Sequence, residues 1–236
     1  IHMPLTFVDG STAEAIAPLR LGIQDMPASI YTSAGLGGVD RTLNFRYVDG
    51  STFMHEGPLG TYEGVDGTTV ELWQPNPDLL AECPNLVFRF GDWFVGVRTC
   101  QRELSESEKG DWARLLSGEV TDGGFLVLSA EGRLKLQETG GHEGPQLILG
   151  KARSNWIQLR PGECDPEGYT GEDIRIMPDG TRVSFSRIPH SNGIEYDWFV
   201  NWCEDGLMTV QVEYAYKDFA EATAEGFRIN DTVLAP

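Results

Sequence analysis

The dipeptide Asp-Gly occurs six times in this 236-residue chain, at residues 9–10, 49–50, 66–67, 122–123, 179–180 and 205–206. Both central residues of a type I′ turn need a positive φ, so Asp-Gly between two extended runs favours a tight β-hairpin. Several copies stand between such runs, as in LNFRYVDGSTFMHE, DIRIMPDGTRVSFS and DWFVNWCEDGLMTVQVEYAY. Two further hairpins are expected in LVFRFGDWFVGVR and FLVLSAEGRLKL. The pattern predicts an all-β, mostly antiparallel fold.

Short helices are expected at a few places only. Ser105 and Glu108 have the spacing of a capping box at the start of SESEKGDWARLLSG, as do Asp218 and Glu221 in DFAEATAEG. A third candidate is STAEAIAPL, near the start of the chain. Because these helices do not alternate regularly with strands, a doubly wound parallel sheet is disfavoured.

Neighbouring hairpins dominate the pattern, and a closed barrel removes the unpaired edges that they would leave. We therefore expect an antiparallel meander β-barrel, lipocalin-like in architecture, with two or three short helices. A β-sandwich and two tandem small barrels are the alternatives. We interpret Ile1 and His2, which precede Met3, as a vector remnant. The remaining residues 3–236 are expected to form a single all-β domain, with a division into two lobes near 118–123 left open.

The chain is strongly acidic, with 36 Asp and Glu against 18 Lys and Arg and a formal net charge of −18. This charge disfavours nucleic acids and anionic membranes as partners, because both require clustered cations. If Met3 is the native start, the sequence predicts a cytoplasmic protein whose four cysteines are reduced. The alternative is a bridge between Cys83 and Cys100, which fall opposite one another if Gly91-Asp92 forms a two-residue turn.

No metal or cofactor is expected. His-Glu-Gly-Pro occurs twice, at 55–58 and 142–145, but neither copy has the second histidine of an H-E-x-x-H site. We interpret both copies as turns at strand ends. The segment ECDPEGYTGED at 163–173 is rich in carboxylates, but its spacing departs from an EF-hand loop. We interpret it as a solvated acidic loop.

The last hairpin carries the candidate catalytic residues. With Asp205-Gly206 as a two-residue turn, one face combines Tyr196, Trp198, Val200 and Trp202 with Ala215, Glu213, Gln211 and Thr209. On this face Glu213 is the expected acid/base, because a carboxylate beside indoles in a dry site has a raised pKa. Tyr196 would donate a hydrogen bond, Trp198 and Trp202 would form walls, and Gln211 would orient the ligand. A three-residue turn would shift this register by one residue, and these side chains would then no longer share one face.

Two further kinds of candidate lie elsewhere. His190 is a candidate general base, since few histidines are available, although a turn role fits RIPHSNG better. In the hairpin around Gly91-Asp92, Arg89 and Arg98 share one face with Phe94 and could bind an anionic substrate. Pairing with nearby carboxylates is the simpler interpretation of both arginines.

Three functions fit these features. The first is binding of an apolar or aromatic small molecule, with cofactor-independent isomerase, cyclase or lyase chemistry. The second is an acidic, non-catalytic interaction module of the inhibitor or immunity type. The third is a carbohydrate-binding β-sandwich that uses exposed tryptophans. The sequence does not decide whether the chain is an enzyme or whether it forms a homodimer.

Overall fold

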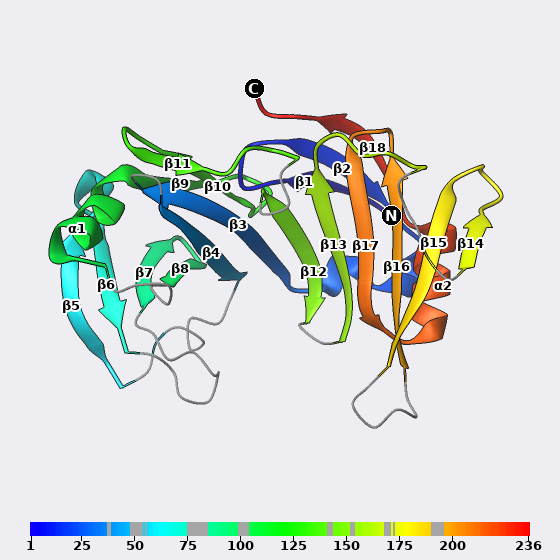
Figure 1. The fold of residues 1–236 in the computed structure, drawn as a ribbon, viewed down its shortest axis with the longest axis horizontal. Coiled ribbons are helices and arrows are strands. Elements are labelled where there is room, and N and C mark those ends of the chain that lie inside the picture. The colour runs from blue at the N-terminus through cyan, green and yellow to red at the C-terminus, as the bar shows by residue number, and fades with distance from the viewer. Residues whose placement is uncertain are drawn as a thin grey trace. The chain divides into compact units, whose positions relative to one another are not determined.

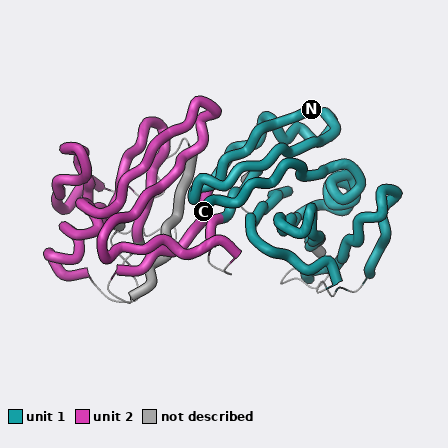
Figure 2. The backbone as a smooth tube through the Cα atoms, turned by 90° about the horizontal axis from the view of Figure 1, so that it is seen from above, with its two compact units in different colours: residues 1–29, 146–236 teal, residues 30–145 magenta. Residues whose placement is uncertain are grey.

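A computed structural model describes residues 1–36, 39–47, 54, 56–74, 85–98, 104–140, 144–151, 154–167, 171, 173–189 and 196–236. The chain divides into two compact units: unit 1, with residues 1–29 and 146–236, and unit 2, with residues 30–145. Figure 2 shows unit 1 in teal and unit 2 in magenta. Residues 118–123, where the sequence leaves a division open, lie within unit 2.

Unit 1 is built on an antiparallel sheet whose strands follow the spatial order β14-β15-β16-β17-β13-β12 (Figure 1). Their bounds are β12 Gln146–Lys151, β13 Ser154–Pro161, β14 Asp173–Ile176, β15 Arg182–Pro189, β16 Tyr196–Glu204 and β17 Met208–Ala215. A second sheet of unit 1 has the order β1-β2-β18, with bounds β1 His2–Thr6, β2 Thr12–Ile16 and β18 Arg228–Val233. Helix α2 spans Lys217–Gly226, and two 3-10 turns span Leu19–Leu21 and Ile23–Asp25.

The strand order of unit 1 includes a crossover that the sequence does not predict. Strand β13 pairs with β17, although the next strand along the chain, β14, lies beyond β17, β16 and β15. Residues 162–172, which we call the crossover segment, make this connection. The expectation that hairpin-connected neighbours alone build the sheet is therefore wrong in unit 1.

The β16–β17 hairpin bonds to the crossover segment, and its register differs from the predicted one. Asp205 and Gly206 have the expected positive φ values of 51° and 65°. The Leu207 N–H also donates to the Glu204 carbonyl (3.0 Å), which closes the expected turn. However, Glu204 pairs with Met208, so Leu207 is a third loop residue and the predicted register of the two strands is wrong. The Leu207 carbonyl accepts a hydrogen bond from the Gly162 N–H (3.0 Å), and the Gly206 carbonyl accepts one from the Cys164 N–H (3.0 Å). These two hydrogen bonds hold the turn against the crossover segment.

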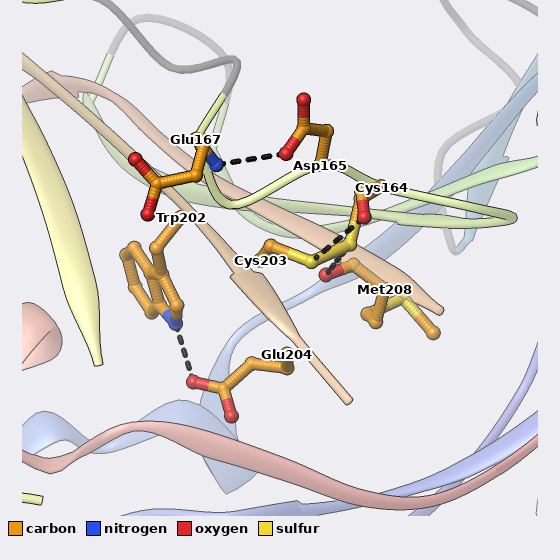
Figure 3. Close-up of a disulfide and its surroundings, with 7 residues drawn as sticks. All are labelled: Cys164, Asp165, Glu167, Trp202, Cys203, Glu204 and Met208. Carbon is orange, nitrogen blue, oxygen red and sulfur yellow. Dashed lines mark hydrogen bonds between the residues drawn. A yellow bond between two sulfur atoms is a disulfide. The ribbon is translucent and has the colours of Figure 1, made fainter. Parts of the chain in front are cut away.

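A disulfide joins the crossover segment to β16. It links Cys164 and Cys203, whose Cα atoms are 5.9 Å apart. In Figure 3, Cys203 points toward Cys164, whereas its neighbours Trp202 and Glu204 point toward one another. The expectation that all four cysteines are reduced is therefore wrong for this pair. The predicted pairing of Cys83 with Cys100 lies outside the described residues.

One face of the unit 1 sheet forms the core. Val200, Trp202, Val210 and Val212 are fully buried. The Trp202 ring contacts Phe227 edge-on, with ring centroids 6.5 Å apart. Phe227 lies between α2 and β18, so this face of the sheet packs on the second layer of unit 1.

Unit 2 contains further antiparallel strands, in the order β3-β4-β8-β7-β6-β5. Strand β11 pairs with β3, and β9 pairs with β10. Their bounds are β3 Ala28–Leu36, β4 Val39–Tyr47, β5 Pro58–Glu63, β6 Thr69–Trp73, β7 Asn85–Phe90, β8 Trp93–Arg98, β9 Leu116–Val120, β10 Leu126–Ala130 and β11 Leu134–Leu136. A 3-10 turn spans Val65–Gly67, and helix α1 spans Glu106–Leu115.

The two hairpins expected in unit 2 have different outcomes. In β7–β8, Phe90 pairs with Trp93 as predicted, so the two-residue turn at Gly91-Asp92 is confirmed. The hairpin predicted between residues 125 and 136 is wrong, because β10 pairs with β9 and β11 pairs with β3.

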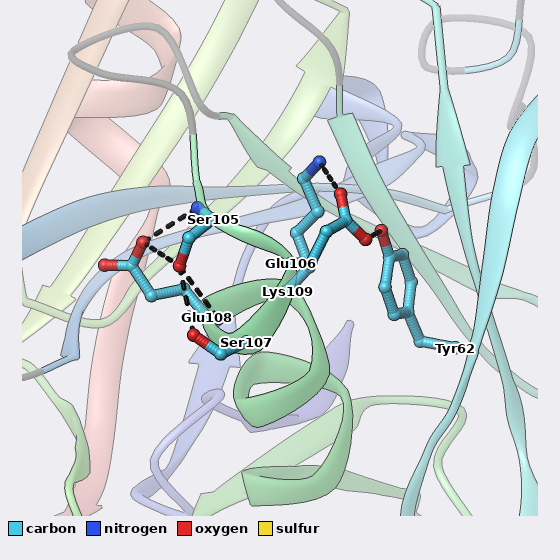
Figure 4. A network of polar contacts seen from close by, with 6 residues as sticks. All are labelled: Tyr62, Ser105, Glu106, Ser107, Glu108 and Lys109. Atoms are coloured by element: carbon cyan, nitrogen blue, oxygen red, sulfur yellow. Dashed lines mark hydrogen bonds and ion pairs between the residues drawn. The ribbon is translucent and has the colours of Figure 1, made fainter.

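Helix α1 begins as predicted and is tied to β5. Ser105 and Glu108 form the expected capping box, with the Glu108 N–H 3.3 Å from Ser105 Oγ. Figure 4 shows Glu106 between two further partners: the Tyr62 hydroxyl donates to Oε2 (2.9 Å), and Lys109 Nζ lies 2.7 Å from Oε1. Burial, and then the hydrogen bond to Glu106, raise the pKa of Tyr62 to about 12.

The other two predicted helices differ from the structure. The segment 11–19 contains strand β2 instead of a helix, since Ala13 and Ala15 alternate with outward residues and are buried in the small sheet. Helix α2 begins at Lys217, and its N-cap is Tyr216, whose side chain makes no capping hydrogen bond. The predicted capping box at Asp218 is therefore wrong, although the helix itself is confirmed.

The all-β, antiparallel prediction is confirmed. The described strands form several sheets, and no closed barrel is found among them. Neither helix in the described part of the chain has the length and apolar character needed to cross a membrane.

Removing the disulfide should destabilise unit 1. Cys164 and Cys203 are 39 residues apart, so their link restricts the unfolded chain by about 4 kcal/mol in the chain-entropy model. We expect the double variant Cys164→Ala/Cys203→Ala to lower the free energy of unfolding in urea by up to this amount. The difference from the unmodified protein should vanish when both are measured in reductant. Equal stability without reductant would show that the bridge does not hold the crossover segment.

Candidate functional site

The candidate site is the side of the unit 1 sheet opposite its core, which we call the polar face. Four side chains lie in register across four neighbouring strands: Gln158 on β13 pairs with Gln211 on β17, Gln211 with Asn201 on β16, and Asn201 with Ser184 on β15. Paired residues of an antiparallel sheet point to the same side. Amide and hydroxyl groups therefore lie together on this face, and Gly171 of the crossover segment lies against the Ser184 hydroxyl.

The alternation of buried and polar residues produces this row. In β13, Ile157 and Leu159 are fully buried in the core, so Trp156, Gln158 and Arg160 point to the opposite side. The same alternation in β17 buries Val210 and Val212 and places Thr209, Gln211 and Glu213 on the polar face. In β16 it places Phe199 and Asn201 there.

Several groups of the row are withdrawn from solvent. Asn201 is 9% exposed and Ser184 is 3% exposed. Among the described residues, the Asn201 side-chain oxygen has no hydrogen-bond partner. A buried amide oxygen without a partner is unusual in a folded protein, because desolvation costs free energy that a hydrogen bond normally offsets. Gln158 is different, since its Nε2 donates to Gln146 Oε1 (2.6 Å).

Glu213 lies on the polar face beside an indole, but the indole belongs to Trp156, its cross-strand partner. Burial raises the pKa of Glu213 above its ordinary value. The positive charge of Arg160 and a hydrogen bond from Trp156 act in the opposite direction. The Glu213 carboxyl group is therefore partly buried beside an indole, as the sequence predicts, but the indole is that of Trp156 and not of Trp198 or Trp202.

The predicted tryptophan walls are on the other side of the sheet. The register shift pairs Trp202 with Val210, and Trp202 is fully buried in the core. Trp198 shares that side and contacts Phe185 edge-on, with ring centroids 6.3 Å apart. The prediction that these two tryptophans share a face with Glu213 and Gln211 is wrong.

The remaining predicted site residues belong to unit 2 or lie, wholly or in their side chains, outside the described residues. Arg89 and Arg98 belong to unit 2, and the Arg89 guanidinium lies 5.4 Å from the centre of the Phe94 ring, as their shared face predicts. His190 lies outside the described residues, as do the side chains of Tyr196 and Arg98. Trp156, Gln158, Arg160 and Asn201 were not predicted as site residues.

The described residues contain no group of three or more His, Cys, Asp or Glu side chains that could hold a metal ion. Asp165 of the acidic loop accepts a hydrogen bond from the Glu167 N–H (2.9 Å), and Glu167 forms an ion pair with Arg182. These contacts anchor the described part of the loop to β15.

A second carboxylate with a raised pKa lies in the core. Glu204 is 8% exposed, and its Oε1 accepts a hydrogen bond from Trp202 Nε1 (2.5 Å). Burial raises its pKa to about 7, although Trp202 and Arg228, 3.9 Å away, favour the charged form. Arg228 also pairs with Asp179 and, mainly through that hydrogen bond, lowers the pKa of Asp179 to about 2.

Comparison with known proteins adds little to this description. No family model matches the chain, and no curated protein matches it. One similar solved structure is a complex of MucA and MucB from Pseudomonas aeruginosa, with 13% identity, a TM-score of 0.18, and coverage of 90% of this chain and 97% of that chain. Another is MucB in complex with MucA(peri), with 12% identity, a TM-score of 0.17, and coverage of 90% and 96%. Similarities at this level support no conclusion about fold or partner.

Glu204 should make stability depend on pH. Its pKa is higher in the folded than in the unfolded chain, so the folded protein binds more protons between about pH 4.5 and 7. The contribution of Glu204 to the free energy of unfolding therefore falls as pH rises through this range, by on the order of 3 kcal/mol. Glu204→Gln should remove this contribution, as measured by urea unfolding from pH 4.5 to 8.

The exposed Glu225 provides the matched control, since Glu225→Gln should leave the pH profile nearly unchanged. A Glu204→Gln variant with the same pH profile as the unmodified protein would contradict the assignment.

Proposed function

We propose that unit 1 is a saccharide-binding module and that the polar face is its binding surface. The observation that carries this proposal is the in-register set Gln158–Gln211–Asn201, in which the Asn201 oxygen has no partner among the described residues. Hydroxyl groups both donate and accept hydrogen bonds, so a polyhydroxylated ligand can satisfy amide oxygens and amide N–H groups together. An apolar ligand would leave those groups unpaired at a cost in free energy.

The surroundings of the row suit a sugar ring. Trp156 and Phe199 flank it on the same face and are half-buried. Aromatic rings provide flat apolar surfaces, and binding sites combine such surfaces with a few placed polar groups. The proposal corresponds to the third function that fits the sequence and does not depend on a closed barrel.

The test is titration of the purified protein with a panel of soluble neutral and charged glycans, followed by tryptophan fluorescence and calorimetry. Gln211→Ala removes a side chain that makes no hydrogen bond to a described residue, so the fold should tolerate it. We expect it to weaken the binding of a glycan that binds the unmodified protein by roughly fivefold to tenfold, the value of one hydrogen bond.

Gln24 is the control, because it lies in the 3-10 turn Ile23–Asp25 of unit 1, outside the strands, and its described side-chain hydrogen bond is to its neighbour Asp25 (2.9 Å). Gln24→Ala should bind glycans normally. Absence of binding to every glycan, or equal binding by the Gln211→Ala and unmodified proteins, would contradict the proposal.

Proton transfer by Glu213 is a second candidate function of the same face. Its support is the position of Glu213 beside Trp156 and the burial that raises its pKa. If mass spectrometry shows that a bound glycan is converted, Glu213→Gln should abolish the conversion and preserve binding, because it removes the titrating group at nearly constant shape. Unchanged conversion would remove Glu213 from the mechanism.

A further inference from the structure

Arg160 differs from four other arginines of unit 1, which form ion pairs. It lies on the polar face, in the strand that also carries Trp156 and Gln158, and it pairs across strands with Thr209. It is half-buried, yet it makes no hydrogen bond or ion pair with a described residue. Its described electrostatic partner is Glu213, which attracts it without forming an ion pair.

Other arginines of this unit are paired with carboxylates. The ion pairs are Arg20 with Glu225, Arg175 with Asp173 and Glu221, Arg182 with Glu167, and Arg228 with Asp179. In a chain with a net charge of −18, carboxylates are abundant partners. A half-buried guanidinium that pairs with none of them in the described structure is therefore available to an external anion.

The guanidinium group suits a carboxylate ligand, because its N–H groups form a planar fork that can bind both carboxylate oxygens. Trp156, Gln158 and Arg160 follow one another at two-residue intervals, about 7 Å per step along an extended strand. A ring that contacts Gln158 and Gln211 would thus lie between an indole on one side and a guanidinium on the other.

We propose that the ligand of the polar face is an acidic saccharide, such as a uronic acid oligosaccharide, whose carboxylate binds Arg160. This inference rests on the proposed saccharide-binding function and specifies its ligand class. In this proposal the amide side chains of the polar face bind the hydroxyl groups of the saccharide, and Arg160 binds its carboxylate. The net negative charge of the chain then opposes binding of the anion elsewhere on the surface.

The test compares matched pairs of oligosaccharides, galacturonate with galactose and glucuronate with glucose, by calorimetry at low ionic strength. The unmodified protein should bind the acidic member of at least one pair roughly tenfold more tightly or better, which is the range expected for a charged hydrogen-bonded pair. Arg160→Gln should abolish that preference and leave the affinity for the neutral sugar within about twofold.

Arg20→Gln is the matched control, because it removes an arginine of unit 1 that pairs with Glu225 at the surface. It should keep the preference for the acidic sugar, which separates a local effect of Arg160 from the change in net charge. Circular dichroism should confirm that both variants are folded.

The outcomes distinguish this inference from the function on which it rests. Equal affinity for acidic and neutral sugars, or a preference that survives Arg160→Gln, would overturn the role of Arg160 and leave saccharide binding intact. Failure of all the oligosaccharides to bind the unmodified protein would overturn both.

Discussion

The arrangement of unit 1 depends on two backbone hydrogen bonds at one turn. Gly162 and Cys164 of the crossover segment donate to the carbonyls of Leu207 and Gly206. These contacts occupy groups of the β16–β17 turn, and the hairpin accommodates Leu207 as an extra loop residue. Because side chains alternate along a strand, a register shift of one residue decides which side chains share a face.

This shift creates both the core and the polar face. It pairs Val200 with Val212 and Trp202 with Val210 in the core, and Asn201 with Gln211 on the other side. The Cys164–Cys203 disulfide fixes the crossover segment to the same strand. The connection between β13 and β14 is thus bonded both to the β16–β17 turn and to β16.

The β7–β8 hairpin was predictable from its sequence, because its turn at Gly91-Asp92 alone sets the register. The β16–β17 hairpin was not, because its turn bonds to a segment more than 40 residues away along the chain. The sequence does not predict the disulfide for the same reason, since nothing in the local sequence places Cys164 near Cys203. The helix expected in the segment 11–19 does not form, because its alanines suit a helix by propensity but pack in a sheet.

The candidate site was predicted in part. Gln211 and Glu213 were identified, and an indole does lie beside Glu213. Trp156, Gln158 and Arg160 were accessible in principle, because NWIQLRP alternates polar with aliphatic residues, as a half-buried strand does. Asn201 could not have been identified, since its role depends on the register.

The register itself can be measured directly by nuclear Overhauser effects between backbone protons of the isotope-labelled protein. Contacts across β16 and β17 should join Asn201 with Gln211 and Cys203 with Thr209. Contacts that instead join Val200 with Gln211 and Trp202 with Thr209 would contradict the account, because they would place Trp202 on the same face as Gln211.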